Sequence, residues 1–65
     1  MTGQIRTTTV EGKTYKVWSD FIAIETFAEN ENGEIKRIHG NGYINNDLTV
    51  RKAIANVFGH KTFKK

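Results

Sequence analysis

The stretch that decides the fold reads FIAIETFAENENGEIKRIHGNGYI and covers residues 21–44. An apolar run is followed by a polar segment and then by a second, partly apolar run. Asn32-Gly33 stands near the middle, and this dipeptide between two such runs is the strongest short signal for a β-hairpin. The stretch therefore predicts a central hairpin whose turn is at Asn32-Gly33.

A two-residue turn at that point would fix which residues of the two strands face each other. The expected pairs are Glu29–Lys36, Phe27–Ile38, Ala23–Gly42 and Phe21–Ile44. Side chains alternate between the two faces of a strand, so this register also predicts the two faces of the hairpin. The face expected in the core carries Phe21, Ala23, Phe27, Ile38 and Ile44. The opposite face carries Ile22, Ile24, Thr26, Arg37, His39 and Tyr43.

Two alternatives to this register stay open. The two-residue turn sets Glu31 beside Glu34, an unfavourable pair of like charges. A longer loop over residues 29–33 would shift the pairing by one residue and exchange the two faces. Residues 20–29 also fit a helix, because their apolar side chains recur at helical spacing.

The segments on either side of this stretch predict a further hairpin and a helix. Residues 5–10 are rich in β-branched side chains, Glu11-Gly12 suits a tight turn, and residues 13–18 alternate as a second strand. A helix is expected from Asp47 or Val50 to Phe58. Its N-cap candidates are Asn46, Asp47 and Thr49, its C-terminal cap is Gly59, and its buried face is Val50, Ala53, Ile54, Val57 and Phe58.

Composition limits the class of protein. A chain of 65 residues forms one small domain, expected to fray at residues 1–4 and 61–65. It has no cysteine, so neither disulfides nor a thiolate metal site supports the thin core, and a homodimer would enlarge that core. No apolar run of membrane-spanning length and no signal peptide is present, so we expect a cytoplasmic protein without membrane contact.

Charge is distributed unevenly along the chain, whose formal net charge is +3. Residues 1–34 hold three basic and six acidic side chains, whereas residues 35–65 hold seven basic side chains and a single acid, Asp47. Such a division suggests a surface that attracts an anionic partner. The alternative is that the charges only keep a small protein in solution.

Signatures of catalysis are missing. Ser19 is the single serine, and its position relative to His39 and His60 does not suggest a nucleophile with its base. The two histidines lack the spacing of a metal pair, and we expect both at the surface. The glutamates around the Asn32-Gly33 turn are expected to form a solvated acidic tip. We therefore predict a protein without enzymatic activity, cofactor or metal.

Features of a nucleic-acid-binding protein are present. Arg51 and Lys52 stand in the first helical turn, where the helix dipole disfavours cations unless an anion is bound or Asp47 compensates. Trp18 shares its predicted strand with Lys16, and basic residues interleaved with aromatic ones on a sheet are used by proteins that bind single strands, although Trp18 also suits the core. The candidate nucleic-acid-binding residues are Lys16, Trp18, Lys36, Arg37, His39, Arg51, Lys52, Lys61, Lys64 and Lys65.

The order of two hairpins and one helix resembles the single-stranded-DNA-binding transcriptional coactivators of the positive cofactor 4 type. The similarity covers about residues 20–58, and the connection from Trp18 to Phe21 is shorter than in that family. The resemblance implies a curved four-stranded sheet that binds single strands and a helix that packs in a homodimer. It is carried by Glu25, Phe27, Gly33-Glu34, Lys36, Gly42, Asn45 and the amphipathic helix.

Together these patterns predict an α+β domain in which four antiparallel strands form two hairpins and one C-terminal helix packs on the sheet. We expect a small regulatory protein that binds DNA or RNA through its basic C-terminal half. The alternative is a module that binds or inhibits another protein, encoded by a phage or mobile element. In that case the acidic tip formed by Glu29, Glu31 and Glu34 is the expected contact.

Overall fold

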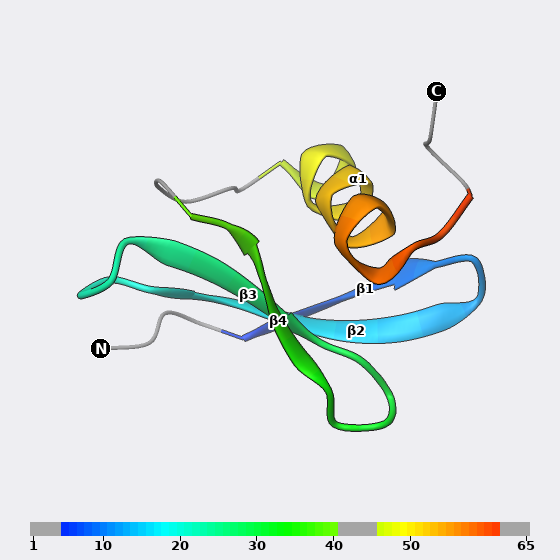
Figure 1. Ribbon diagram of the computed structural model, residues 1–65, viewed down its shortest axis with the longest axis horizontal. Coiled ribbons are helices and arrows are strands. Elements are labelled where there is room, and N and C mark those ends of the chain that lie inside the picture. Colours follow the sequence, from blue (N-terminus) through cyan, green and yellow to red (C-terminus); the bar gives the residue numbers. More distant parts are fainter. Residues whose placement is uncertain (1–4, 41–45, 62–65) are drawn as a thin grey trace.

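A computed structural model of the chain describes residues 5–40 and 46–61 (Figure 1). Its elements are β1 (Arg6–Val10), β2 (Lys13–Asp20), β3 (Glu25–Glu29), β4 (Ile35–His39) and α1 (Asp47–Phe58). Each strand pairs antiparallel with the next one along the chain, and the sheet order is β1-β2-β3-β4. The predicted α+β architecture is confirmed.

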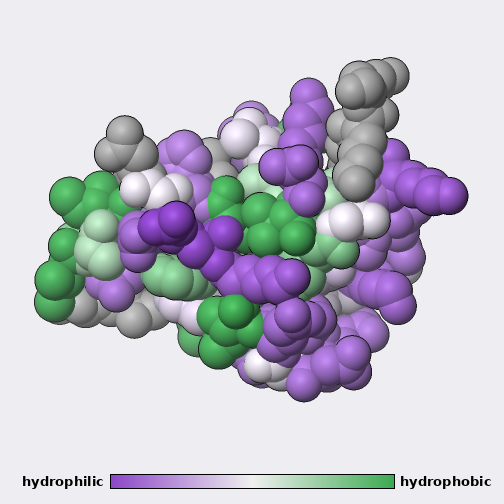
Figure 2. All heavy atoms as spheres, in the orientation of Figure 1, coloured by the Kyte–Doolittle hydropathy of each residue, from purple (hydrophilic) through white to green (hydrophobic). Residues whose placement is uncertain are grey.

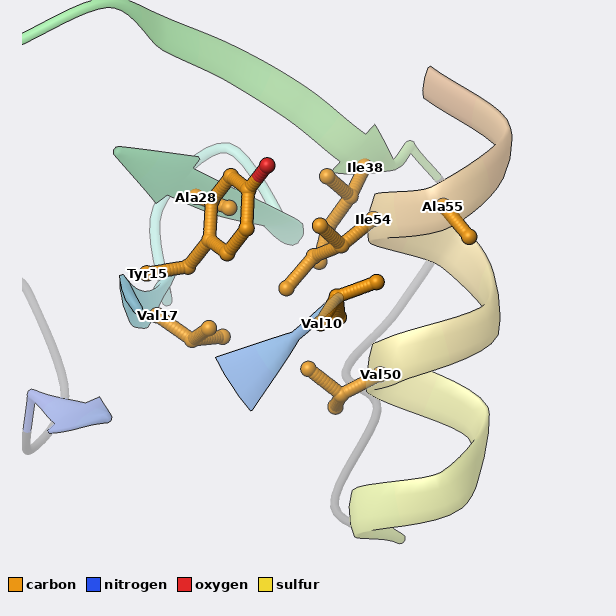
Figure 3. Packing of buried hydrophobic residues seen from close by; sticks show 8 residues of the cluster. All are labelled: Val10, Tyr15, Val17, Ala28, Ile38, Val50, Ile54 and Ala55. Atoms are coloured by element: carbon orange, nitrogen blue, oxygen red, sulfur yellow. The ribbon is translucent and has the colours of Figure 1, made fainter. Parts of the chain in front are cut away.

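The helix covers one face of a strongly coiled sheet. Its contacts are mainly with the two edge strands β1 and β4, so the apolar side of α1 fills the concave side of the sheet (Figure 1). We call this side the inner face and the opposite side the outer face. Figure 3 shows the core between sheet and helix, which consists of Val10, Tyr15, Val17, Ala28, Ile38, Val50, Ile54 and Ala55.

The helix has the ends and the buried side that its sequence predicts. Asn46 is the N-cap, because its side-chain oxygen accepts a hydrogen bond from the Thr49 amide at 3.1 Å. Gly59 ends the helix in the left-handed conformation, with φ of 84°. Val50 and Ile54 are buried, and Ala53, Val57 and Phe58 pack around them; Ala55 is also buried, which the pattern did not predict.

The hairpin over residues 6–20 is confirmed, with Glu11 and Gly12 at its turn. β2 is longer than predicted and runs on to Asp20. Residues 21–24, predicted to be a strand, form the turn that joins β2 to β3. An Asp20 side-chain oxygen accepts hydrogen bonds from the amides of Ile22 at 2.9 Å and Ala23 at 3.2 Å, which closes this turn.

The turn at residues 21–24 overturns several sequence-based expectations. Phe21 and Ala23 are exposed in the turn and are not paired in a strand. The helical alternative for residues 20–29 is wrong as well, because β3 occupies the second half of that segment. The predicted partners Gly42 and Ile44, together with Tyr43, lie outside the described residues.

The register between β3 and β4 is shifted by one residue, as the longer-loop alternative predicts, but the loop covers residues 30–34 and not 29–33. Glu29 pairs with Ile35 and Phe27 with Arg37, so the pairs Glu29–Lys36 and Phe27–Ile38 are wrong by one residue. Asn30 sets the longer loop, because its side-chain oxygen accepts from the amides of Asn32 at 3.0 Å and Glu34 at 2.8 Å.

The shifted register exchanges the faces of the hairpin, as expected for a shift of one residue. Thr26 and Ala28 are buried on the inner face, and Phe27 lies on the outer face. Ile38 remains in the core as predicted, next to an irregularity in the pairing of β3 with β4. Glu31 and Glu34 no longer face each other, and a Glu31 side-chain oxygen instead accepts from the Thr14 amide at 3.0 Å.

Candidate functional site

The outer face carries a row of two aromatic rings and an arginine. Trp18 of β2 lies opposite Phe27 of β3, and Phe27 lies opposite Arg37 of β4. The two rings are stacked, with centroids 6.1 Å apart and planes 18° from parallel. Both rings are half-buried, whereas Arg37 is exposed. This row offers flat aromatic surface beside a planar cation.

A second row lies next to the first on the same face. Lys16 of β2 is opposite Glu29 of β3, and Glu29 is opposite Ile35 of β4. Ile35 is 54% exposed, which is high for an isoleucine. We call the group formed by Lys16, Trp18, Phe27, Ile35 and Arg37 the outer strip.

Carboxylates accompany the cations of the outer strip. An Arg37 guanidinium N–H donates to Glu25 at 2.8 Å, and Lys16 has Glu29 as its cross-strand neighbour. Any phosphate that binds to Arg37 must therefore compete with the Glu25 carboxylate. The strip is consequently suited to a ligand that stacks on the rings as well as contacting the cations.

The other cations proposed from the sequence are directed elsewhere. Lys36 is on the inner side of β4, with its ammonium 5.3 Å from the ring centroid of Phe58 and 3.5 Å from a Glu34 oxygen. Neighbouring residues of a strand point to opposite faces, so Lys36 and Arg37 do not share a surface.

The two helical cations do not form one anion site with the sheet. Arg51 donates through Nε to the Thr9 carbonyl at 3.1 Å, and its Nη1 lies 4.0 Å from an Asp47 oxygen. Asp47 therefore offers the compensation considered above as an alternative to a bound anion. Lys52 is exposed on α1.

The remaining candidates lie near the C-terminal ends of the two described segments or outside them. His39 is half-buried at the end of β4, and Lys61 is exposed after α1. Lys64 and Lys65 lie outside the described residues. Of the ten proposed residues, the structure thus brings Lys16, Trp18 and Arg37 together on one face. It adds Phe27, which sequence reasoning assigned to the core because of the wrong register.

A chain of polar contacts lies on the inner side, near the end of α1. The Tyr15 hydroxyl is hydrogen-bonded to Nε2 of His60, and Nδ1 of His60 lies 2.8 Å from a Glu11 oxygen. His60 is only 9% exposed, so the expectation of a surface histidine is wrong for it. Burial, with a smaller contribution from Glu31, raises the pKa of Tyr15 above its ordinary value. Through these contacts His60, which follows α1, is hydrogen-bonded to Tyr15 and Glu11 of the hairpin formed by β1 and β2.

A polar pocket of about 260 Å³ opens beside these contacts. Its walls combine the rings of Tyr15, Phe58 and His60 with two lysines and two glutamates. Three of these four charged side chains already have partners, since Glu31 accepts from the Thr14 amide and Lys36 pairs with Glu34. In the part of the chain that the structure describes, no group of three or more His, Asp or Glu residues is placed to hold a metal ion.

An apolar turn projects from the sheet where β2 joins β3. Its three large side chains are exposed: Phe21 by 46%, Ile22 by 81% and Ile24 by 49%. Figure 2 shows this turn as an apolar end at the left edge of the molecule. We call residues 21–24 the apolar turn; the sequence pattern assigned them to a strand.

Comparison of this chain with family models, curated proteins and solved structures finds no match. Within residues 5–40 and 46–61, no helix is long and apolar enough to cross a membrane.

Proposed function

We propose that this protein binds single-stranded nucleic acid through the outer strip and acts without catalysing a reaction. The observation that carries the proposal is the cross-strand row of Trp18, Phe27 and Arg37. Stacked aromatic rings accept bases of any sequence, and an adjacent arginine neutralises a phosphate. α1 packs against the inner face, so the helix leaves this row accessible.

The balance of charges suggests a moderate affinity with a mild dependence on salt. Lys16 and Arg37 can neutralise about two phosphates, which gives a slope of log affinity against log salt of about −1.4 for a single strand. Stacking adds about 1–3 kcal/mol per base and is not weakened by counterions in the same way. We therefore expect stacking to supply the larger part of the affinity.

The proposal is tested by titrating a labelled single-stranded oligonucleotide with the protein and following fluorescence anisotropy. Arg37→Ala should weaken binding and make the salt slope shallower by about 0.7, the contribution of one phosphate. Lys52→Ala is the matched control, because Lys52 is also an exposed cation but lies on α1. If the two variants weaken binding equally, or if the wild type does not bind at low salt, the outer strip is not the nucleic-acid site.

A further inference from the structure

The apolar turn is held in one shape by the residue before it. Asp20 accepts two amide hydrogen bonds through its side chain, and its carbonyl accepts a third from the Ile24 amide at 2.8 Å. The exposed side chains are consequently presented on a fixed backbone. Contiguous exposed apolar side chains of this kind often mark a site of interaction with another molecule, whereas single exposed apolar residues do not.

Ile24 provides a second, independent observation. Its φ is 57°, in the left-handed region that β-branched residues rarely adopt. Glycine or asparagine would fit this position without strain, and yet the residue here is a half-exposed isoleucine. Strained residues gather at ligand-binding and switch sites, where the side chain is needed for a contact. An exposed isoleucine in this conformation is consistent with a side chain that contacts another molecule.

The base of the apolar turn is acidic. Asp20 and Glu25 face each other directly across β2 and β3, an unfavourable placement for like charges. Hydrogen bonds from the Ala23 and Ile22 amides hold the pKa of Asp20 below its ordinary value, so this carboxylate is charged at neutral pH. Arg37 pairs with Glu25, so among the described side chains at the base of the turn Asp20 adds a further negative charge.

The charge at the base decides between possible occupants. Nucleic acids and anionic membranes carry negative charge and would be repelled there. A second copy that met the first turn to turn would bring two acidic bases together. A protein with an apolar pocket and basic residues at its rim would complement both the side chains and the charge.

We propose that the apolar turn inserts into an apolar pocket of another protein, whose rim carries lysine or arginine. Ile22 and Ile24 enter the pocket, and the basic rim pairs with Asp20 and Glu25. This contact goes beyond the proposed binding of nucleic acid and is the one required of a protein-interaction module. The two surfaces adjoin at Glu25, which pairs with Arg37 of the outer strip.

The first test uses a photoreactive amino acid in place of Ile22 in the full chain, irradiated in an extract of the cells that make the protein. The control carries the same group in place of Lys52, on the helix. The expected result is that the probe at position 22 forms an adduct with one other protein and the probe at position 52 does not. The cross-linked peptide of that protein should lie in an apolar pocket with a basic rim. An adduct with a second copy, or no adduct specific to position 22, overturns the proposal.

The second test uses the purified cross-linked protein and two variants that should remain folded. Ile22→Ser should lower affinity about tenfold or more. Ile24→Gly should also lower affinity while leaving Tm unchanged or raising it, because glycine relieves the left-handed strain; a purely structural Ile24 would not give this combination. Unaltered affinity in both variants contradicts the proposal. So does a shift of Trp18 emission on vesicles of phosphatidylcholine and phosphatidylserine, which would indicate a lipid surface.

Discussion

Replacing Tyr15 by phenylalanine tests how much the hydrogen bond between Tyr15 and His60 stabilises the fold. The ring would stay against Phe58, from which its centroid lies 5.0 Å, while the hydroxyl that bonds to His60 is lost. His60 is 9% exposed, so its Nε2 would lose its protein partner while most of the ring stays buried, and a replacing water would enter from the polar pocket beside it. The hydrogen bond from His60 to Glu11 would remain.

The expected magnitude follows from the burial of His60. A buried polar group left without a partner costs about 1–3 kcal/mol. For a domain of this size each kcal/mol corresponds to about 4–8 °C in Tm, so a fall in Tm of at least about 4 °C is expected at pH 7. Thr7→Val, which removes an exposed hydroxyl from β1, should stay within about 0.5 kcal/mol and is the control.

The same substitution should change the response to alkaline pH. The pKa of Tyr15 is raised in the folded protein above its ordinary value of 10.0, so the folded state holds this proton more tightly than the unfolded state does. The stability due to this group is therefore complete below pH 10 and is lost as the pH rises through the folded pKa. The difference in free energy of unfolding between wild type and Tyr15→Phe should shrink in that range.

Urea unfolding followed by circular dichroism at pH 7 and at several values above pH 10 measures both effects. Equal stability of the two proteins at pH 7 would show that the Tyr15–His60 contact contributes nothing. A constant difference across the alkaline range would show that Tyr15 titrates as in the unfolded chain.

Three further predictions concern the core, the loop and the outer strip. Ile54→Ala should lower the free energy of unfolding by about 2–5 kcal/mol in urea titration, because Ile54 is fully buried; an unchanged midpoint would mean that α1 is not packed as described. Gly33→Val should lower the free energy of unfolding by about 1–3 kcal/mol, measured as a fall in Tm, since Gly33 has φ of 84°. Gly33→Asn should lower it clearly less, and equal losses would show that the positive φ is not the cause. Glu25→Gln should strengthen nucleic-acid binding in anisotropy titrations because it releases Arg37 for phosphate, and weaker binding would exclude competition between carboxylate and phosphate.

Sequence reasoning succeeded where local patterns decide the structure. The helical spacing of Val50, Ile54 and Val57, with Gly59 after them, depends on residues within a few positions of one another, and α1 was predicted closely. The first hairpin was predicted for the same reason. A turn at Asn32-Gly33 requires positive φ at the glycine, and Gly33 has φ of 84°.

The predicted register between β3 and β4 was wrong because particular side chains, and not the apolar pattern, decide it. Asn30 closes the five-residue loop through two amide hydrogen bonds, and Asp20 closes the turn before β3 in the same way. Asparagine and aspartate can do this in many loops, and the sequence does not show which of them will. The exposed apolar side chains of residues 21–24 added to the error, since such a run ordinarily indicates a strand.

The candidate site was predicted only in part, because it also depends on which face of the sheet each side chain occupies. Clustering of basic residues along the chain suggested one basic surface, but strand alternation sends Lys36 inward and Arg37 outward, and Arg51 is bonded to β1. Among the described residues eight basic and seven acidic side chains leave a net charge of only +1. Phe27 could be assigned to the site only once its pairing with Trp18 was known.

The most direct test of the proposed function uses the single tryptophan of the sequence, Trp18, which lies in the outer strip. Its fluorescence is recorded while single-stranded oligothymidylate is added at low salt. We expect saturable quenching by base stacking, with a midpoint that matches the anisotropy titration and shifts to higher concentration in Phe27→Leu. Unchanged emission, with or without binding detected by anisotropy, would contradict the placement of nucleic acid on the outer face.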